Sequence, residues 1–249
     1  MRKELLASLS MIGSLAAAGA AAAQTCATPP SCATLGFTKS ETDCDGLEAL
    51  KCPFDQSKLY CPQGGGNMSA AAPGAILYSD GTISDSVIAS KTPVGIVAYV
   101  NGSTGFAVAL TESNQTWGGY GYNVSCLGDM DSGAASADMN GRVNTQCLVS
   151  DSQTHPAANY CNTFSAVSSG KGSSGWYLPA AGELKAMSYS YGAINLGLQK
   201  LSKTQISSSY YWSSSEGSND YAWYVSPSDG NMYDDGKTLS RPVRCVLAL

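Results

Sequence analysis

The 249-residue chain has few charged side chains and a single histidine, and both shortages limit what it can do. Charged residues make up 13% of the sequence, and the formal net charge is −5. A nucleic-acid-binding protein needs a basic surface to neutralise phosphates, so we expect no nucleic-acid partner. With one imidazole in the chain, a Ser–His or Cys–His catalytic pair would have to use His155. This residue precedes Pro156 at a predicted helix start, where we expect an ordinary surface role.

Motifs of common catalytic and metal sites are also missing. The chain has no G-x-S-x-G nucleophile elbow, no phosphate-binding glycine motif and no EF-hand loop. Calcium prefers oxygen ligands, and two groups of aspartates could offer them without following a calcium motif. These groups are Asp129, Asp131 and Asp138, and Asp229, Asp234 and Asp235. The sequence therefore predicts no cofactor and no metal, and no catalytic residue is assigned.

Residues 1–23 have the pattern of a secretory signal peptide. Arg2 and Lys3 precede an uncharged apolar segment over 5–22, and three alanines before Gln24 fit a small-x-small cleavage site. A membrane anchor is the alternative, but the alanine and glycine content and the cleavage site favour removal. No other segment is apolar enough to span a bilayer. The mature chain is therefore expected to be secreted or at the cell surface, with the periplasm as a further option.

Nine cysteines in an exported chain predict a disulfide framework. Five of them fall in residues 24–62, a segment too short to bury much apolar surface without cross-links. They are Cys26, Cys32, Cys44, Cys52 and Cys61. No Cys-x-x-Cys and no histidine occurs there, which disfavours zinc. The odd total leaves one thiol over, for which Cys26 is the natural candidate, and the connectivity of the other four stays open.

The rest of the chain predicts a linker and one larger domain. Residues 63–72 contain three consecutive glycines and indicate a flexible linker, and residues 73–249 indicate a domain of α+β class. Residues 111–140 are expected to be rich in loops. Strands are predicted over 75–78, 94–100 and 105–110, with an Asn101-Gly102 turn between the last two. Helices are predicted over 140–149, 156–165, 180–187 and 193–201.

The last forty residues alternate apolar and polar positions. Trp212, Trp223 and Val225 are expected in the core, whereas the Ser, Asn, Asp, Tyr and Gly residues between such positions are expected on exposed recognition loops. Tyrosine supplies a large rigid contact area, and Ser, Gly and Asn supply adaptable hydrogen bonds, as in antibody paratopes. The predicted ligand contacts are Tyr210, Ser218, Asn219, Asp220, Tyr221, Tyr224, Ser228, Asp229, Asn231, Tyr233 and Asp234.

Five motifs in a fixed order resemble those of a family of exported bacterial domains. They are GWYLP at 175–179, GEL at 182–184, YWSSSE at 211–216, AWYV at 222–225 and PVRCV at 242–246. Over residues 73–249 the chain is similar to the family of the Legionella collagen-like adhesin C-terminal domain and the Fibrobacter major paralogous domain. This resemblance implies a C-type-lectin-like fold, with a small twisted antiparallel sheet, two or more flanking helices and long loops that carry recognition.

The resemblance also has implications for the cysteines. It implies a disulfide between Cys161, on the first helix of the fold, and Cys245, on the last strand, which leaves Cys126 and Cys147 to each other. Formylglycine-generating enzymes share the lectin-like fold but need a reactive cysteine pair, and here Cys161 and Cys245 stand where the structural bridge is expected.

Two further properties of the lectin-like fold bear on the ligand. The Glu-Pro-Asn and Trp-Asn-Asp signatures of calcium-dependent sugar-binding lectins are absent, so the resemblance does not imply sugar binding. Some members of this fold are variable proteins of diversity-generating retroelements. Residues 217–240 are rich in Asn, Ser, Tyr, Asp and Gly, which is the composition of such a diversified segment. The alternative is an ordinary polar loop region of the family.

These observations predict an exported binding protein, not an enzyme, that displays residues 210–240 to an unknown protein or glycan ligand. A structural or assembly component of a surface appendage, with the cysteine-rich segment as its docking part, is the alternative. A secreted hydrolase is third. It would pair two of the carboxylates within residues 216–235, but acidic side chains in a polar segment are usually solvated.

Overall fold

The computed structural model describes residues 37–40, 50–52, 55–62, 71–101 and 104–249. The first described part is a three-stranded antiparallel sheet of β1 (Phe37–Ser40), β2 (Leu50–Cys52) and β3 (Asp55–Pro62), in which β3 is the central strand. The predicted signal peptide, most of the predicted linker, the Asn101-Gly102 turn and the disulfide pairing of the first five cysteines lie outside the described residues.

A six-stranded antiparallel sheet forms the centre of the larger domain, in the order β5-β4-β6-β7-β14-β9. Its long central strands are β6 (Pro93–Asn101) and β7 (Thr104–Ala109), which confirms two of the predicted strands. β4 (Ile76–Tyr78) confirms the third, and β5 (Ile83–Ser84) pairs with its outer edge. The C-terminal strand β14 (Val246–Ala248) lies between β7 and β9 (Trp176–Tyr177), so the end of the chain is held inside the sheet.

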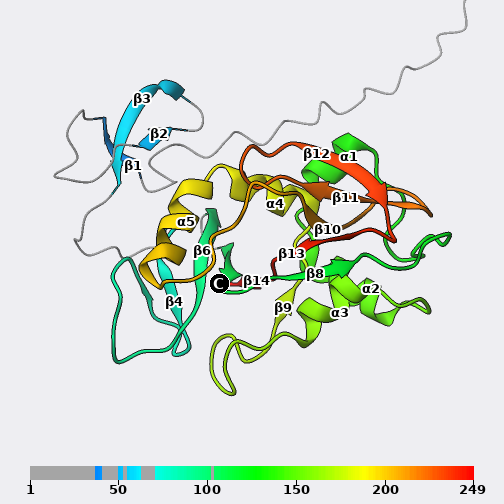
Figure 1. Cartoon of the computed structure of the whole chain (residues 1–249), viewed down its shortest axis with the longest axis horizontal. Helices are drawn as coiled ribbons and strands as arrows, with labels where there is room; N and C mark the ends of the chain where they lie inside the picture. Colours follow the sequence, from blue (N-terminus) through cyan, green and yellow to red (C-terminus); the bar gives the residue numbers. More distant parts are fainter. Residues whose placement is uncertain (1–36, 41–49, 53–54, 63–70, 102–103) are drawn as a thin grey trace, which may run out of the picture.

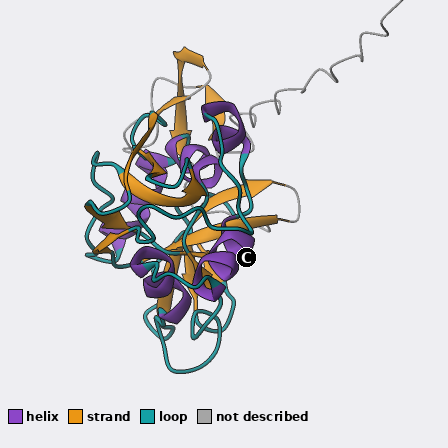
Figure 2. Ribbon diagram, turned by 90° about the vertical axis from the view of Figure 1, so that its right-hand side faces the viewer, coloured by secondary structure: helices purple, strands orange, loops and turns teal. Residues whose placement is uncertain are grey.

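Helices cover both faces of this sheet (Figure 1). Because successive side chains of a strand point to opposite faces, Val108 of β7 packs into one apolar cluster and its neighbour Ala107 into another. The first cluster includes side chains of α4 (Ala181–Ser188) and α5 (Tyr191–Lys200), and the second includes side chains of α2 (Gly141–Ser150) and α3 (Pro156–Thr163). In the view turned by 90°, helices again flank the strands on both sides (Figure 2).

The four predicted helices are confirmed with shifts of a few residues at their ends, and residues 111–140 are rich in loops as predicted, with two short elements among them. This segment contains β8 (Ser113–Thr116) and α1 (Ser132–Ala137). The sequence of β8 is polar, and the segment becomes a strand only because it pairs with β13 (Ser240–Val243), which is distant in the sequence. The short α1 depends on its cap, since the Asp131 carboxylate accepts a hydrogen bond from the Ala134 N–H at 2.8 Å.

The predicted recognition loops are largely a second antiparallel sheet. Its strands are β10 (Tyr211–Glu216), β11 (Tyr221–Val225) and β12 (Met232–Gly236), with β11 in the centre. These strands lie beside the β8–β13 pair in Figure 1. Trp212 and Trp223 are buried, which confirms their predicted place in the core.

The architecture is therefore a mixed α+β domain with antiparallel sheets. Both disulfides that the resemblance implied are present, Cys126–Cys147 and Cys161–Cys245. The second is buried and ties α3 to the residue before β14. None of the helices in the described part of the chain has the length and apolar character needed to cross a membrane.

Candidate binding surface

The second sheet brings three of the predicted contact residues together on one face. Tyr224 is the cross-strand partner of both Trp212 and Tyr233, so these side chains share a face of the sheet. The Tyr210 ring lies 5.0 Å from the ring of Tyr224 and 5.7 Å from that of Tyr233, with edge-to-face geometry in both pairs. We call Tyr210, Tyr224 and Tyr233 the tyrosine face. Its members are half-buried except Tyr233, which is 52% exposed.

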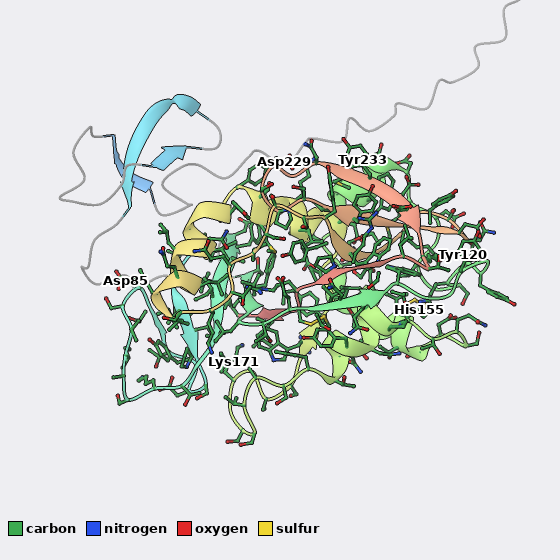
Figure 3. The ribbon with its side chains drawn as sticks, in the orientation of Figure 1. Asp85, Tyr120, His155, Lys171, Asp229 and Tyr233 are labelled. Carbon is green, nitrogen blue, oxygen red and sulfur yellow. A yellow bond between two sulfur atoms is a disulfide. The ribbon has the colours of Figure 1, made fainter. Side chains whose placement is uncertain are left out.

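Other predicted contacts are placed elsewhere on the same sheet. Tyr221 and Asp234 are exposed but belong to the opposite face, because they alternate with Tyr224 and Tyr233 along their strands. The remaining six lie in two turns. Ser218, Asn219 and Asp220 form the β10–β11 turn, and Ser228, Asp229 and Asn231 lie in the β11–β12 turn. Figure 3 shows Asp229 and Tyr233 along the same side of the domain, away from Tyr120.

Arg241, which the sequence did not single out, completes the tyrosine face. Its guanidinium carbon lies 3.9 Å from the centroid of the Tyr224 ring and 5.3 Å from that of Trp212, and it forms an ion pair with Asp235. Burial raises the pKa of Tyr224 even though Arg241 acts in the opposite direction, so the phenol stays neutral at physiological pH. Arg241 belongs to β13, and no local pattern links it to the tyrosines. Arg241 reaches the tyrosines only because the β8–β13 pair packs beside the β10-β11-β12 sheet.

A second group of exposed tyrosines adjoins the β10–β11 turn. Tyr120 and Tyr122 are 54% and 58% exposed and lie in the glycine-rich loop that follows Trp117. The Gly121 N–H donates a hydrogen bond of 2.9 Å to the Asn219 carbonyl, so this loop and the turn lie side by side. The Gly-Gly-Tyr-Gly-Tyr run is visible in the sequence, but its proximity to residue 219 is not.

The motif serines are buried, in contrast to the expectation that serines of this region are displayed. Ser213, Ser214 and Ser215 have no exposed surface. The Ser213 hydroxyl donates to the Trp223 carbonyl at 2.7 Å, and the Ser215 hydroxyl donates to the Asp138 carboxylate at 2.7 Å. Each of these hydroxyls has a hydrogen-bond partner inside the domain, which compensates for the hydrogen bonds to water that it loses on burial.

Glu216 is also buried, where it forms an ion pair with Lys237. The Lys237 ammonium lies 2.6 Å from a Glu216 oxygen, and both side chains have no exposed surface. The Val124 N–H donates to both oxygens of the carboxylate, and Lys237 also donates to the Tyr122 carbonyl at 2.8 Å. Burial raises the pKa of Glu216, and Lys237 opposes that rise. The pair therefore fixes the tyrosine-bearing loop at residue 122 to the end of β10.

The surface role expected for His155 is wrong, since its side chain is fully buried. Its Nε2 lies 3.0 Å from an Asp151 oxygen, and this hydrogen bond holds the pKa of that carboxyl below its usual range. Its ring meets the edge of Trp117 at a centroid distance of 5.0 Å. Gly119 (φ +63°) crosses above it so closely that a Cβ there would lie 2.6 Å from the imidazole carbon. The absence of a side chain at residue 119 is what allows a loop to cover this histidine.

Several of the aspartates considered for calcium bond to other groups of the protein. Within the described residues, no three or more His, Cys, Asp or Glu side chains are grouped as metal ligands. Asp131 caps α1, Asp138 is buried and bonded to Ser215 and Asn144, and Asp229 accepts from the backbone and side chain of Asn231.

Glu183, in the second motif, gives folding stability an expected pH dependence. It accepts hydrogen bonds from the Ala180 N–H and the Tyr177 hydroxyl, and burial raises its pKa to about 7. The folded state thus binds the Glu183 proton more tightly than the unfolded state does. The stability that the folded protein gains from holding this proton is fully present below the unfolded pKa of ~4.3. It is lost as pH rises through about 7. We expect the free energy of unfolding to fall by roughly 3 kcal/mol across this range.

Urea unfolding of the wild type and Glu183→Gln at pH 5 and pH 8 measures this effect. The difference between the two proteins isolates one group, since other groups titrate equally in both. We expect most of the fall in stability to be absent from the variant. Equal pH dependence in the two proteins would show that Glu183 is ionised in the folded state.

Comparison with known proteins assigns the domain. The model of the Lcl C-terminal domain family matches residues 122–247, which is 126 of the 249 residues. The chain belongs to this family. The matched part of the Lcl C-terminal domain contains both disulfides, the tyrosine face and Arg241, so the five motifs identified the family correctly.

A solved structure with a similar fold helps to place this Lcl C-terminal domain protein. It is a fimbrial protein from Bacteroides ovatus ATCC 8483, with a TM-score of 0.58 and 20% sequence identity. The alignment covers 70% of this chain and 48% of the fimbrial protein, so the match spans about half the length of that protein. A search of the curated proteins found no match.

Proposed function

We propose that this Lcl C-terminal domain protein is an exported, non-enzymatic binding protein and that its tyrosine face contacts a protein or glycan ligand. The observation that carries the proposal is the edge-to-face packing of Tyr210 against Tyr224 and Tyr233 on one side of an ordered sheet. Aromatic rings that are already held in place lose little conformational entropy when a ligand binds. The buried Glu216–Lys237 pair beneath the same strands supports this preorganisation.

We further propose that the domain is C-type-lectin-like and that it works outside the cytoplasm. A disulfide that joins an early helix to the segment before the last strand, together with helices on both faces of an antiparallel sheet, supports the lectin-like assignment. The two disulfides support export, since such bonds persist in oxidising compartments. The signal-peptide pattern of residues 1–23 supports the same location.

Two tyrosines of matched exposure test the proposed face. Tyr233 and Tyr221 are 52% and 48% exposed and lie on neighbouring strands, but they belong to opposite faces of the sheet. We expect Tyr233→Ala to weaken ligand binding by at least ~2 kcal/mol, as is typical of an aromatic hot spot, and Tyr221→Ala to leave it unchanged. Arrays of immobilised extracellular proteins and glycans, probed with the mature chain, supply the ligand and the binding measurement.

Thermal unfolding of both variants is the control for this experiment. Both side chains are half exposed, so we expect each midpoint to stay within a few degrees of the wild type. Loss of binding in Tyr221→Ala with retention in Tyr233→Ala would place the ligand on the opposite face. Retention in both variants would remove the sheet from the binding site.

The likeness to a fimbrial protein favours a second candidate, a component of a surface appendage. In this case the domain would be a building block, and ligand binding would be secondary. Incorporation of a Tyr210→Ala/Tyr224→Ala/Tyr233→Ala variant into a surface structure of the native cell discriminates the two. Normal assembly of a variant that has lost ligand binding would separate the two roles, and loss of assembly would support the appendage function.

Retroelement diversification of residues 217–240 has a separate test. Buried positions such as Ala222, Trp223 and Lys237 alternate with exposed polar positions such as Asn219 and Tyr233, an arrangement in which variation would alter the surface and spare the core. A gene for a reverse transcriptase beside a near-copy of the 3′ end of the coding sequence would support diversification. Without them, this segment is an ordinary polar surface of the family.

A further inference from the structure

β12 is an edge strand whose outer backbone groups are unpaired. Among the described strands it pairs with β11 alone, and the β10-β11-β12 sheet ends there. The Ser226 N–H donates to the Asn231 carbonyl at 2.9 Å, which fixes where the hydrogen-bonded pairs of the β11–β12 ladder fall. Such pairs alternate along antiparallel strands with pairs that exchange no hydrogen bond. The N–H and C=O groups of Met232 and Asp234 therefore point away from β11, and no described residue bonds to them.

The sequence of β12 leaves this edge open to another strand. Natural sheets protect a free edge with lysine, proline, a bulge or a covering segment. The five residues of β12 include no lysine or proline, and its pairing with β11 has no register shift. Asp235 is neutralised by Arg241, so the charge left on the strand is that of Asp234. Figure 1 shows β12 along the outer margin of the domain.

An added strand would place alternate side chains over two chemically different faces. Tyr233 lies on the tyrosine face, and Asp234, the cross-strand partner of Trp223, lies on the opposite face. A residue opposite Tyr233 would therefore contact its ring, which is 52% exposed. The residues opposite Met232 and Asp234 would lie over the Trp223 face. These latter residues would also exchange the backbone hydrogen bonds with β12.

The Trp223 face is acidic beside this edge. Asp129, Asp131 and Asp234 are exposed, and none of them forms an ion pair with another described residue. The Trp223 indole N–H donates at 2.9 Å to the carbonyl between the first two aspartates, which places them on this side of the sheet. Asp131 caps α1, and α1 lies beside β12. Lys185 of α4 bonds to a serine of α1 and neutralises none of the three.

We infer that the ligand is an extended protein segment that adds to β12 as a fourth strand of the second sheet. Its apolar side chains lie over the tyrosine face and alternate with basic side chains over the acidic Trp223 face. This inference rests on the proposed function and specifies its partner. Strand addition obtains affinity from main-chain hydrogen bonds and specificity from alternate side chains, and a glycan has no such main chain. A second copy of this chain would bring another Asp234 to the edge, and like charges across strands are destabilising.

Two peptides with identical side chains test the inference on the mature full-length chain. Both have eight residues of alternating lysine and valine, and one is N-methylated at its lysines and the other at its valines. With lysines over the Trp223 face, the lysine N–H groups bond to β12 and the valine N–H groups point away from it. We expect the valine-methylated peptide to bind at least ~10-fold more tightly, because only it keeps these hydrogen bonds. NMR chemical shifts or intrinsic fluorescence measure the binding.

Two variants of one residue separate the charge of the edge from its backbone. Both Asp234→Asn and Asp234→Pro remove the carboxylate, but only the proline also removes the outward N–H. We expect Asp234→Asn to weaken binding of the valine-methylated peptide by ~3-fold at low salt, and Asp234→Pro by at least ~10-fold. Acetylation of the peptide lysines should match the effect of Asp234→Asn. Proline is tolerated on edge strands, and the thermal midpoint shows that each variant is folded.

Hydrogen exchange of the Met232 and Asp234 amides locates the added strand. We expect both amides to exchange freely in the protein alone and to become protected when the valine-methylated peptide binds. Protection in the protein alone would mean that a second copy, or a part of this chain outside the described residues, already occupies the edge. That result would overturn the inference. Equal affinity for the two methylated peptides, binding of neither, or full affinity in Asp234→Pro would also overturn it.

The array ligands separate failure of this inference from failure of the proposed function. A protein or glycan whose binding is lost in Tyr233→Ala but unaffected by Asp234→Pro would keep the tyrosine face as the binding site and reject strand addition. If no peptide or array component bound in a manner that depends on Tyr233, the proposed function would fail as well. If Asp234→Pro did not fold, the two methylated peptides would still decide the inference, because they require no change in the protein.

Discussion

Lys237→Met is expected to lower the free energy of unfolding by about 3–5 kcal/mol, because it leaves the Glu216 carboxylate buried without its counter-ion. Both side chains of this pair are fully buried, and the ammonium lies 2.6 Å from the carboxylate. The variant also loses the bond from Lys237 to the Tyr122 carbonyl and the cation–π contact with Trp117, whose ring centroid lies 4.8 Å away. Urea unfolding at neutral pH measures the loss.

A double variant is the control that distinguishes the effect of an unpaired buried charge from the effect of a changed side-chain volume. Lys237→Met/Glu216→Met removes both charges at once, and apolar replacements of a buried ion pair are often neutral. We therefore expect the double variant to recover most of the stability lost in Lys237→Met. Arg241→Met should cost less, about 1 kcal/mol or under, because the Arg241–Asp235 pair is partly exposed. A small effect of Lys237→Met alone would mean that water reaches Glu216.

The double variant Cys161→Ala/Cys245→Ala is expected to destabilise the domain by about 4–5 kcal/mol. The disulfide joins residues 84 positions apart, and in the chain-entropy model a loop of this length gives a loss of that size. Both sulfurs are buried within the apolar cluster that α3 shares with the central sheet, so their removal also leaves unfilled volume. Denaturant unfolding of the oxidised proteins checks the value.

Cys126→Ala/Cys147→Ala is the matched comparison. This bridge spans 21 positions, and Cys126 is exposed while Cys147 is half-buried. The shorter loop predicts a loss of about 3 kcal/mol with little packing cost. A larger loss for this bridge than for Cys161–Cys245 would contradict the ranking. Such a result would show that the loop near residue 126 contributes more to the fold than the attachment of α3 to the last strands.

These stabilities bear on recognition through the rigidity of the tyrosine face. β11 and β12 carry the exposed tyrosines, while buried side chains of β10 hold this sheet in place. Ser213 bonds to Trp223 of β11, Ser215 bonds to Asp138, and Glu216 accepts from the Val124 N–H. A surface held in this way is expected to bind with little rearrangement. Loosening by Lys237→Met should therefore weaken binding even at temperatures where the variant stays folded.

The sequence by itself determined the properties that depend on local pattern. Short apolar runs over 94–100 and 105–110, with a turn signal between them, were sufficient for the two central strands, and helical patterns were sufficient for α2 to α5. Trp212 and Trp223 could be assigned to the core because a large apolar side chain is stabilised by burial wherever the fold places it. The five motifs were sufficient for the family, since their order is a property of the chain and not of its coordinates.

Only the tertiary structure decided which polar residues are buried. Ser213 to Glu216 have the composition of an exposed turn, and their burial is tolerated because partners at residues 124, 138, 144, 223 and 237 satisfy their polar side chains. The burial of His155 also depends on residues distant from any local pattern: Nε2 lies beside Asp151, the backbone of Gly119 passes above the ring, and Nδ1 has no hydrogen-bond partner among the described residues. A polar side chain does not reveal in the sequence whether its partner will be water or another residue far along the chain.

The register of the second sheet made the final distinction. Tyr221, Tyr224 and Tyr233 were equivalent in the sequence, but the alternation of faces along β11 and the pairing of Tyr224 with Tyr233 put two of them together and Tyr221 on the other side. Arg241 reached the same face from β13 through the packing of separate strands. Amino-acid composition was sufficient to predict that this region is a ligand-binding surface. Which side chains act together depended on hydrogen-bond register, and register is set by contacts between residues that the sequence keeps apart.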